Sequence, residues 1–330
     1  MERRVLGRTG RLVSVVGLGT WQLGADWGEV SDDDSRAVLE AALESGVTFY
    51  DTADVYGDGR SEQALGRFVK DHPDAGITVA TKMGRRVDQT PENYVLANFR
   101  EWTDRSRRNL GVDTLDLVQL HCPPTSVYST AEVYDALDTL VAEGAVANYG
   151  VSVETCDEAI EAIKHPGVAS VQIILNAFRL KPLEQVLPAA SAAGVGVIAR
   201  VPLASGLLSG RYTKETAFAP SDHRSYNRHG EAFDVGETFS GVDYDTGVTA
   251  AAEFAALTAT LPGGLSPAQA AIAWIWQQPG VSTVIPGARS AEQARANAAA
   301  GAVPALGPLF ASEIRELYDR HLRDQIHSRW

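Results

Sequence analysis

The stretch GVTFYDTADVYGDGRSEQALGRFVK (residues 46–70) shows the pattern that decides the fold. A short apolar run at 47–50 is followed by a polar loop with Asp51 and Tyr56, and then by an amphipathic helix that we expect to begin after Ser61. Such a short and apolar run is typical of a parallel strand buried on both faces. The stretch therefore predicts one strand–loop–helix unit of an α/β protein.

The same unit recurs along the 330 residues. Because the units are so numerous, they fit a (β/α)8 TIM barrel better than an open doubly wound sheet. The segment RRVLGRTGRLVSVVGLG (3–19) predicts a β-hairpin with its turn at Thr9–Gly10, which would plug the bottom of the barrel. The further strand candidates lie at 77–80, 115–120, 147–151, 168–174, 195–201 and 281–285, with a weaker eighth at 302–305.

No linker divides the sequence, so we predict a single barrel domain over residues 1–330. The main interruption is a long loop at 212–247, after the sixth predicted strand, which is rich in Gly, Ser, Asp and aromatic residues. A loop of this length in a compact domain is usually functional or mobile.

The composition excludes several classes of protein. A formal charge of −13 argues against nucleic acid or an anionic membrane as a partner, because both require basic surfaces. No apolar run approaches the roughly 20 residues that span a bilayer, and the first residues lack the apolar stretch of a signal peptide. The two cysteines, Cys122 and Cys156, imply no disulfide framework. We expect a cytoplasmic protein, monomeric or weakly homo-oligomeric, that acts on a small molecule.

Familiar motifs of other enzyme classes are missing. Gly17, Gly19 and Gly24 have the wrong spacing for a Rossmann fingerprint, and neither a phosphate-binding GK[ST] loop nor HExxH occurs. The acidic run at 32–34 suits the first turn of a helix, because carboxylates there are stabilised by the helix dipole. We therefore predict no metal site.

Four ionisable side chains follow three successive predicted strands. Asp51 ends the first strand and Tyr56 lies in the loop after it, while Lys82 ends the second strand and His121 the third. Each alone has an ordinary structural explanation as a cap, an ion-pair partner or a core group. Because the carboxyl ends of neighbouring barrel strands converge, we expect the four to meet in one cavity.

Their combined chemistry suits proton delivery to an oxygen that gains charge. A phenol has an ordinary pKa near 10, and a lysine cation held by Asp51 would lower that of Tyr56, making it a usable proton donor. His121 would orient a carbonyl oxygen by a hydrogen bond. Nucleophilic hydrolysis is disfavoured because no Ser or Cys is paired with a base. A hydrolase with two catalytic carboxylates is disfavoured because no second acid lies near Asp51 in the sequence, and only a distant acid such as Glu154 could supply it.

At these residues the sequence resembles the aldo-keto reductases, in particular the bacterial NADP-dependent members, over nearly its whole length. The resemblance implies that Asp51, Tyr56, Lys82 and His121 form the family's catalytic tetrad, with Tyr56 as general acid. It also implies a nicotinamide cofactor bound across the top of the barrel. The matching segments are LGRTGRLVSVVGLGTWQLG, FYDTADVYGDGRSEQALG, VATK, LDLVQLH, YGVS, VPLASGLLSGRY and VIPGARSAEQARAN.

The last matching segments predict the cofactor contacts. Gly287 precedes a helix capped by Ser290, and a helix N-terminus beside the cation Arg289 is an anion site, which favours NADPH over NADH. Gln293 and Asn297 lie one turn apart on that helix and would reach the phosphate or the adenine. In VPLASGLLSGRY we expect pyrophosphate contacts. By resemblance, Ser152 and Gln172 would hold the carboxamide, and Thr20 and Trp21 would border the nicotinamide. The candidate contacts in VPLASGLLSGRY are Pro202, Leu203, Ser205, Gly206, Leu208, Ser209 and Arg211.

Three positions depart from the family pattern. Val153 replaces a frequent Asn, Arg200 stands where an aromatic ring often faces the nicotinamide, and Ala296 stands where an acid is common. These departures concern the affinity for the cofactor and the preference between NADP and NAD, and they leave the tetrad untouched.

The resemblance implies reversible, NADPH-dependent reduction of an aldehyde or ketone, without a metal. The alternative is a cofactor-binding, redox-sensing regulatory subunit with little turnover. We expect Trp21, Trp27, Tyr56 and His121 to line the substrate pocket. The aromatic and basic residues of 212–247 fit either a binding surface for a sugar-like or anionic carbonyl compound or a solvated loop with a few buried rings.

Overall fold

The computed structural model describes residues 1–24 and 30–330, and in these a parallel barrel is formed by eight strands. Each strand pairs with its neighbour in chain order, and bridges from Val16 to Val284 and from Gly19 to Gly287 join the first strand region to the last. The predicted (β/α)8 fold is therefore confirmed. The strands are β3 (Leu18–Gly19), β4 (Phe49–Asp51), β5 (Thr78–Met83), β6 (Leu117–His121), β7 (Tyr149–Ser152), β8 (Val168–Ile174), β9 (Gly196–Arg200) and β10 (Val281–Val284).

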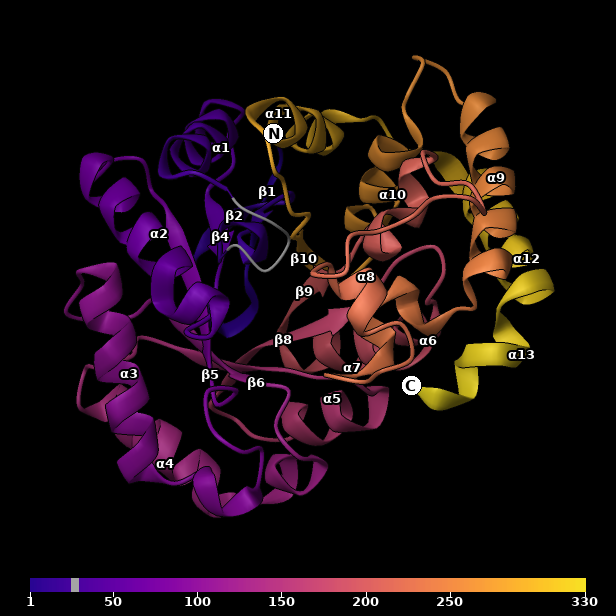
Figure 1. Cartoon of the computed structure of the whole chain (residues 1–330). Helices are drawn as coiled ribbons and strands as arrows, with labels where there is room; N and C mark the ends of the chain where they lie inside the picture. Colours follow the sequence, from indigo (N-terminus) through magenta and orange to yellow (C-terminus); the bar gives the residue numbers. More distant parts are fainter. Residues whose placement is uncertain (25–29) are drawn as a thin grey trace.

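Helices surround the strands as an outer ring (Figure 1). Their buried faces and the outward side chains of the strands form one large apolar core. Among the described helices, none has both the length and the apolar character needed to cross a membrane. The helices are α1 (Asp32–Glu44), α2 (Arg60–Asp71), α3 (Leu96–Leu110), α4 (Ala131–Ala142), α5 (Cys156–Ile163), α6 (Lys181–Glu184), α7 (Val186–Ala193), α8 (His223–Tyr226), α9 (Tyr244–Ala259), α10 (Pro267–Trp276), α11 (Ala291–Ala299), α12 (Gly307–His321) and α13 (Arg323–Ile326).

Helix α2 begins earlier than its sequence predicted. Its N-cap is Gly59, with a φ of 95°, and Ser61 lies inside the helix. The hydroxyl of Ser61 donates to the carbonyl of Thr20 at 3.1 Å and is fully buried. This serine therefore ties α2 to the loop after β3 and does not cap the helix.

The N-terminal segment forms the predicted hairpin, β1 (Arg3–Val5) paired with β2 (Leu12–Ser14). Leu6 and Val13 are fully buried and belong to a small cluster with side chains from inside the barrel. At Gly7, a Cβ would lie only 2.0 Å from the backbone nitrogen of Gly196, so a residue without a side chain is required for the close approach. The hairpin therefore closes the amino-terminal end of the barrel.

Two predicted boundaries were wrong. The eighth strand is β3, a two-residue strand that directly precedes the loop of Trp21. No strand forms at 302–305, where Ala302 ends a 3-10 turn at Ala300–Ala302 and the next residues are irregular. The long loop ends at Asp243, because the carboxylate of this residue caps α9 by accepting from the backbone of Thr246 at 3.0 Å. We call residues 212–243 the covering segment, since they lie over one side of the barrel mouth.

Candidate active site

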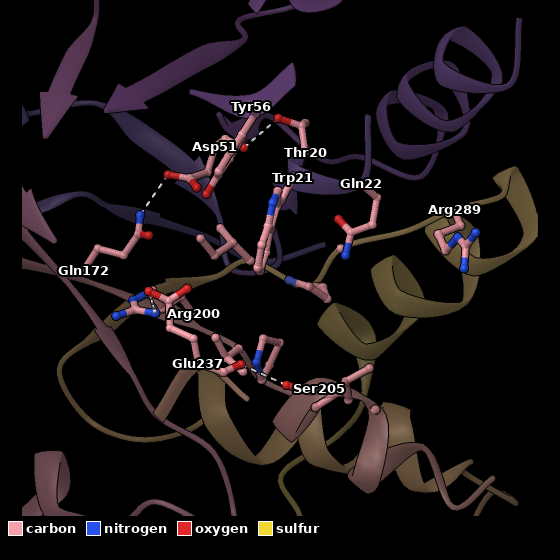
Figure 2. Close-up of a pocket in the computed structure, with 18 of the residues that line it drawn as sticks. Thr20, Trp21, Gln22, Asp51, Tyr56, Gln172, Arg200, Ser205, Glu237 and Arg289 are labelled. Carbon is pink, nitrogen blue, oxygen red and sulfur yellow. Dashed lines mark hydrogen bonds and ion pairs between the residues drawn. The ribbon is translucent and has the colours of Figure 1, made fainter. Parts of the chain in front are cut away.

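A cavity of about 300 Å³ opens at the carboxyl ends of the strands. Figure 2 shows Asp51 and Tyr56 on one side of it and Arg289 far across it, with Trp21 between them. The cavity thus spans the distance from the predicted catalytic residues to the predicted anion site. Its lining residues are Gly19, Thr20, Trp21, Gln22, Asp51, Tyr56, His121, Ser152, Gln172, Arg200, Val201, Pro202, Leu203, Ser205, Gly206, Tyr212, Arg224, Glu237, Ile285, Pro286, Gly287, Arg289 and Gln293.

The structure brings the four predicted catalytic residues together. The Lys82 ammonium donates to Asp51 Oδ1 at 2.5 Å, to the backbone oxygen of Thr52 at 2.8 Å and to the Tyr56 hydroxyl at 3.3 Å. The rings of Tyr56 and His121 meet edge to face, with centroids 6.0 Å apart. Lys82 lies beneath Tyr56 rather than in the cavity wall, and its side chain is only 1% exposed.

Two glutamines, one on β6 and one on β8, donate hydrogen bonds to the other carboxylate oxygen of Asp51. Gln172 donates to Oδ2 at 2.8 Å and Gln119 at 3.2 Å. The sequence alone indicated Gln172 only as a carboxamide contact, and Gln119 not at all. Both amides donate to a buried carboxylate oxygen, and without these hydrogen bonds the burial of that oxygen would cost free energy. The carboxylate is therefore fixed on both sides, and so is the ammonium that it holds.

The pKa of Tyr56 corrects one expectation. Burial raises it above its ordinary value, and this effect is larger than the lowering by Lys82, while Asp51 and Glu237 raise it further. Lys82 thus lowers the pKa of Tyr56, as predicted, but burial raises it by more. For Lys82 itself, burial lowers the pKa, but the charges and hydrogen bonds of Asp51 and Tyr56 together raise it above its ordinary value, so the ammonium stays charged. The site accordingly holds a protonated phenol beside a permanent cation.

His121 is a neutral imidazole in this site. Burial lowers its pKa well below the ordinary value, and the cations Arg85, Lys82 and Arg200 lower it further. Its Nδ1 is buried and has no hydrogen-bond partner among the residues that the structure describes. A neutral ring retains one N–H donor, which suits it to hydrogen bond a carbonyl oxygen without transferring charge.

We expect the imidazole of His121 not to titrate between about pH 5.5 and pH 8, because a lowered pKa keeps it neutral as the pH falls through the ordinary histidine range. NMR chemical shifts of the ring, assigned by comparison with His121→Gln, measure this. A titration midpoint near 6.5 would contradict the buried, cation-flanked environment.

Two glycines bring the loop of Trp21 against the loop of Tyr56. A Cβ on Gly57, which has a φ of 58°, would lie 2.3 Å from the carbonyl oxygen of Gly24. This close backbone approach stacks the Trp21 ring on Tyr56, with centroids 6.0 Å apart. Trp21 therefore forms one wall of the predicted substrate pocket. Trp27, the other predicted wall residue, lies outside the described residues.

The covering segment contributes to the same wall. The rings of His223 and Phe233 lie 5.2 and 5.9 Å from that of Trp21. Phe218 and Phe239 pack against each other underneath the segment, where Arg224 lies over the Phe218 ring at 4.4 Å, whereas Tyr226 is exposed and Tyr212 lines the cavity. Some rings of the segment therefore lie beside Trp21 and others are buried under the segment, and a binding surface for a sugar-like or anionic carbonyl compound stays a prediction.

At the far end, α11 begins at the predicted anion site. The Ser290 hydroxyl accepts from the backbone of Gln293, and the Gln293 side chain accepts from the backbone of Arg289 at 2.8 Å. Both Arg289 and Gln293 are exposed and line the cavity. Asn297 does not line it, because its amide donates to the carbonyl of Gly287 at 3.1 Å.

The turn after β9 presents strained backbone to the cavity. Val201 and Ser205 have φ values of 53° and 54°, which are unusual for residues with a side chain, and for a β-branched residue above all. Such strain is typical of functional sites, and here it exposes backbone along the predicted pyrophosphate path. Pro202, Leu203, Ser205 and Gly206 line the cavity, whereas three predicted contacts lie outside its lining: Leu208, Ser209 and Arg211.

Sequence reasoning missed a charged group on the cavity wall. Glu237 of the covering segment lines the cavity beside Arg200, the predicted departure from the family pattern (Figure 2). Glu237 is far from every motif in the sequence, so no local signal could have identified it. Gln22, another unexpected lining residue, follows Trp21 directly and lies against Gly287.

Comparison with known proteins places these features in one family. Residues 15–319 match the model of the aldo/keto reductase family. An uncharacterized oxidoreductase, YqkF of Bacillus subtilis, is 29% identical over 301 residues, which cover 90% of each chain. A D-threo-aldose 1-dehydrogenase from a Pseudomonas species is 33% identical over 229 residues, which cover 61% of this chain and 69% of the relative.

Solved structures agree. The holo form of the aldo-keto reductase AKR11C1 from Bacillus halodurans has a TM-score of 0.78 and is 26% identical, with 99% of each chain covered. An aldo/keto reductase from Klebsiella pneumoniae, in complex with NADP and acetate, has a TM-score of 0.69 and is 25% identical, with 96% of each chain covered. With its barrel, its strand-end residues and a family match over nearly the whole chain, this protein belongs to the aldo/keto reductase family of oxidoreductases.

Proposed function

We propose that this protein uses NADPH to reduce an aldehyde or ketone to an alcohol, reversibly. The observation that carries the proposal is the contact of the Tyr56 hydroxyl with the Lys82 ammonium, 3.3 Å away, at the floor of the cavity. A proton donor backed by a fixed cation is what reduction of a carbonyl group requires, since the oxygen gains negative charge as it is reduced.

Each residue of the site has a role in this proposal. Tyr56 donates its proton to the carbonyl oxygen, and the phenolate that results is stabilised by Lys82. Asp51 holds the ammonium within reach at 2.5 Å. The neutral imidazole of His121 orients the carbonyl oxygen by a hydrogen bond, and Trp21 limits the access of water from one side.

The cavity fits a nicotinamide dinucleotide. Ser152 and Gln172 lie near the catalytic end, the strained turn after β9 follows, and Arg289 with Gln293 lies at the far end. When bound, NADPH supplies the hydride that reduces the carbonyl carbon. The Klebsiella neighbour solved with NADP supports this choice of cofactor.

The preference for NADPH would depend on Arg289. We expect Arg289→Leu to weaken NADPH binding about 10- to 100-fold and to leave NADH binding unchanged, because a charge-assisted hydrogen bond to the 2′-phosphate would be lost. Fluorescence titration with both cofactors measures it. The matched control is Arg295→Leu, because Arg295 is an exposed residue of α11, the helix that begins just after Arg289, and pairs with Glu44 at 3.1 Å. An equal loss for NADH and NADPH would place the 2′-phosphate elsewhere.

The first experiment is the initial rate of NADPH oxidation with an activated aromatic aldehyde, followed by a panel that includes aldoses, because a relative is named as an aldose dehydrogenase. Turnover supports the reductase. Tight NADPH binding without turnover on the whole panel would favour the redox-sensing alternative.

A further inference from the structure

Four charged side chains from four different segments meet at the wall of the cavity, where two of them, Arg200 and Glu237, line it. Arg85 follows β5, Glu154 follows β7, Arg200 ends β9, and Glu237 belongs to the covering segment. We call them the ion cluster. Their side chains are between 9% and 18% exposed, so the charges are largely withdrawn from water. Buried charges are tolerated when they are paired, and these are.

Glu237 links the covering segment to the barrel by two ion pairs. Its carboxylate lies 3.0 Å from Arg85 and 3.6 Å from Arg200. Glu154 bridges the same two guanidinium groups, at 3.3 and 2.9 Å. Because Arg85 and Arg200 belong to the barrel, opening the covering segment would separate Glu237 from both cations.

The ion cluster reaches the catalytic residues directly. Arg85 Nε donates to the backbone oxygen of His121 at 3.2 Å, so the group that holds Glu237 also holds the end of β6. Behind Glu237, its own carbonyl accepts from the Ser205 hydroxyl at 2.9 Å, on the turn that lines the predicted pyrophosphate path. Glu237 thus connects the covering segment to the catalytic end and to the middle of the predicted cofactor site.

We propose that Glu237 is a positioning residue that fastens the covering segment over the cavity and, through Arg85, fixes His121, and that protonation of the neighbouring Glu154 makes this closure sensitive to pH. The proposal rests on the proposed function, because the cavity that is closed is the one assigned to NADPH and its carbonyl substrate.

The carboxyl groups of Glu154 and Glu237 are neighbours in the ion cluster. One carboxylate oxygen of Glu154, one of Glu237 and the Cys122 sulfur all lie within 4.8 Å of one another. Burial raises the pKa of Glu154 to about 7, against the effect of Arg200. For Glu237, burial is outweighed by Arg85 and Arg200, and the pKa falls to about 2.

Other titratable groups surround Glu154 and Glu237. Burial raises the pKa of the Cys122 thiol to about 12, so it stays neutral. Arg179, which follows β8, donates to the backbone oxygen of Glu154, and burial lowers its pKa to about 10, which leaves it charged at neutral pH. Asp234, on the covering segment, has a pKa raised by burial. Lys82 and His121 complete the groups that face the ion cluster.

The direction of the pH effect follows from these shifts. In an open segment both glutamates would be hydrated, with ordinary pKa values near 4.3. A raised pKa means that the closed state of Glu154 binds its proton more tightly, so closure is favoured at low pH and weakens as the pH rises through about 7. The lowered pKa of Glu237 favours closure above its ordinary value and is lost only toward pH 2. Closure should therefore be firmest near about pH 4 to 5 and should weaken as the pH rises from there to about 7.

Hydrogen exchange of the covering segment tests the proposal without cofactor. We expect exchange of the peptide around 235–241 to be about 10- to 100-fold faster in Glu237→Gln than in the wild type. In the wild type it should accelerate between about pH 5 and pH 7 beyond the intrinsic base-catalysed rise, and Glu154→Gln should abolish that excess. The matched control is Glu231→Gln, which removes an exposed carboxylate from the same segment.

Stopped-flow measurement of NADPH release provides the second readout. Glu237→Gln should release the cofactor faster, with a smaller change in the rate of the chemical step. Exchange in Glu237→Gln equal to that in Glu231→Gln, or an excess that persists in Glu154→Gln, would overturn the inference. If the wild type fails to bind NADPH, the proposed function falls, while hydrogen exchange still decides the role of Glu237.

Discussion

Replacing Tyr56 by Phe should lower the rate of NADPH-dependent carbonyl reduction about 10²- to 10⁴-fold, which is the contribution typical of general acid catalysis. The substitution removes only the hydroxyl that lies 3.3 Å from the Lys82 ammonium. It keeps the ring that stacks on Trp21 and meets His121, so the walls of the cavity should stay in place. The NADPH dissociation constant should change by less than about threefold.

Single-turnover rates and fluorescence titration measure the two quantities separately. A fair control is Tyr244→Phe, because this phenol donates to the backbone of Thr213 at 2.9 Å, is absent from the lining of the cavity, and is a tyrosine in its own hydrogen bond. If Tyr56→Phe retained the wild-type rate, another group would have to supply the proton, and the proposed mechanism would fail.

The sequence was sufficient to predict the parts of the site that are local in the chain. Asp51 and Tyr56 lie five residues apart, and Lys82 and His121 lie at or next to the ends of strands whose apolar runs are easily recognised. The barrel then brings these ends together, because its topology leaves little choice. The two-residue strand β3 had no such signal, and an apolar stretch at 302–305 was mistaken for the missing strand.

Contacts between residues distant in the chain could not be predicted in the same way. The Gln172 amide holds Asp51 across 121 positions, and Glu237 meets Arg85 across 152. Neither pair has a spacing that a periodic pattern could reveal. Their partners are set by the shape of the cavity, which appears only when the covering segment is folded.

The relative size of the two effects on the pKa of Tyr56, burial and the Lys82 charge, could likewise not be predicted from the sequence. The sequence gives the sign of the Lys82 effect on the pKa of Tyr56, but its size relative to burial depends on how completely the phenol is enclosed. The structure shows that burial is the larger effect. A more weakly acidic phenol remains protonated over the whole neutral range, so the proton needed for reduction is always present, while the reverse reaction would require its loss.

Replacing Lys82 by Met should destabilise the protein by about 3–5 kcal/mol, because the Asp51 carboxylate would remain buried without its cation. The two side chains are 1% and 3% exposed, so water cannot compensate. Unfolding by denaturant measures the loss. Methionine fills a similar volume and retains the apolar stem, and so the expected effect arises mainly from the uncompensated charge.

The double variant Asp51→Asn/Lys82→Met tests this reasoning, because it removes both charges while Gln119 and Gln172 can still donate to the Asn side chain. It should recover most of the lost free energy of unfolding. It should not recover activity, since the cation beside the Tyr56 hydroxyl is still missing. A double variant as unstable as Lys82→Met alone would show that the loss comes from packing, and a double variant that reduces carbonyl compounds would separate Tyr56 from the lysine that we propose to assist it.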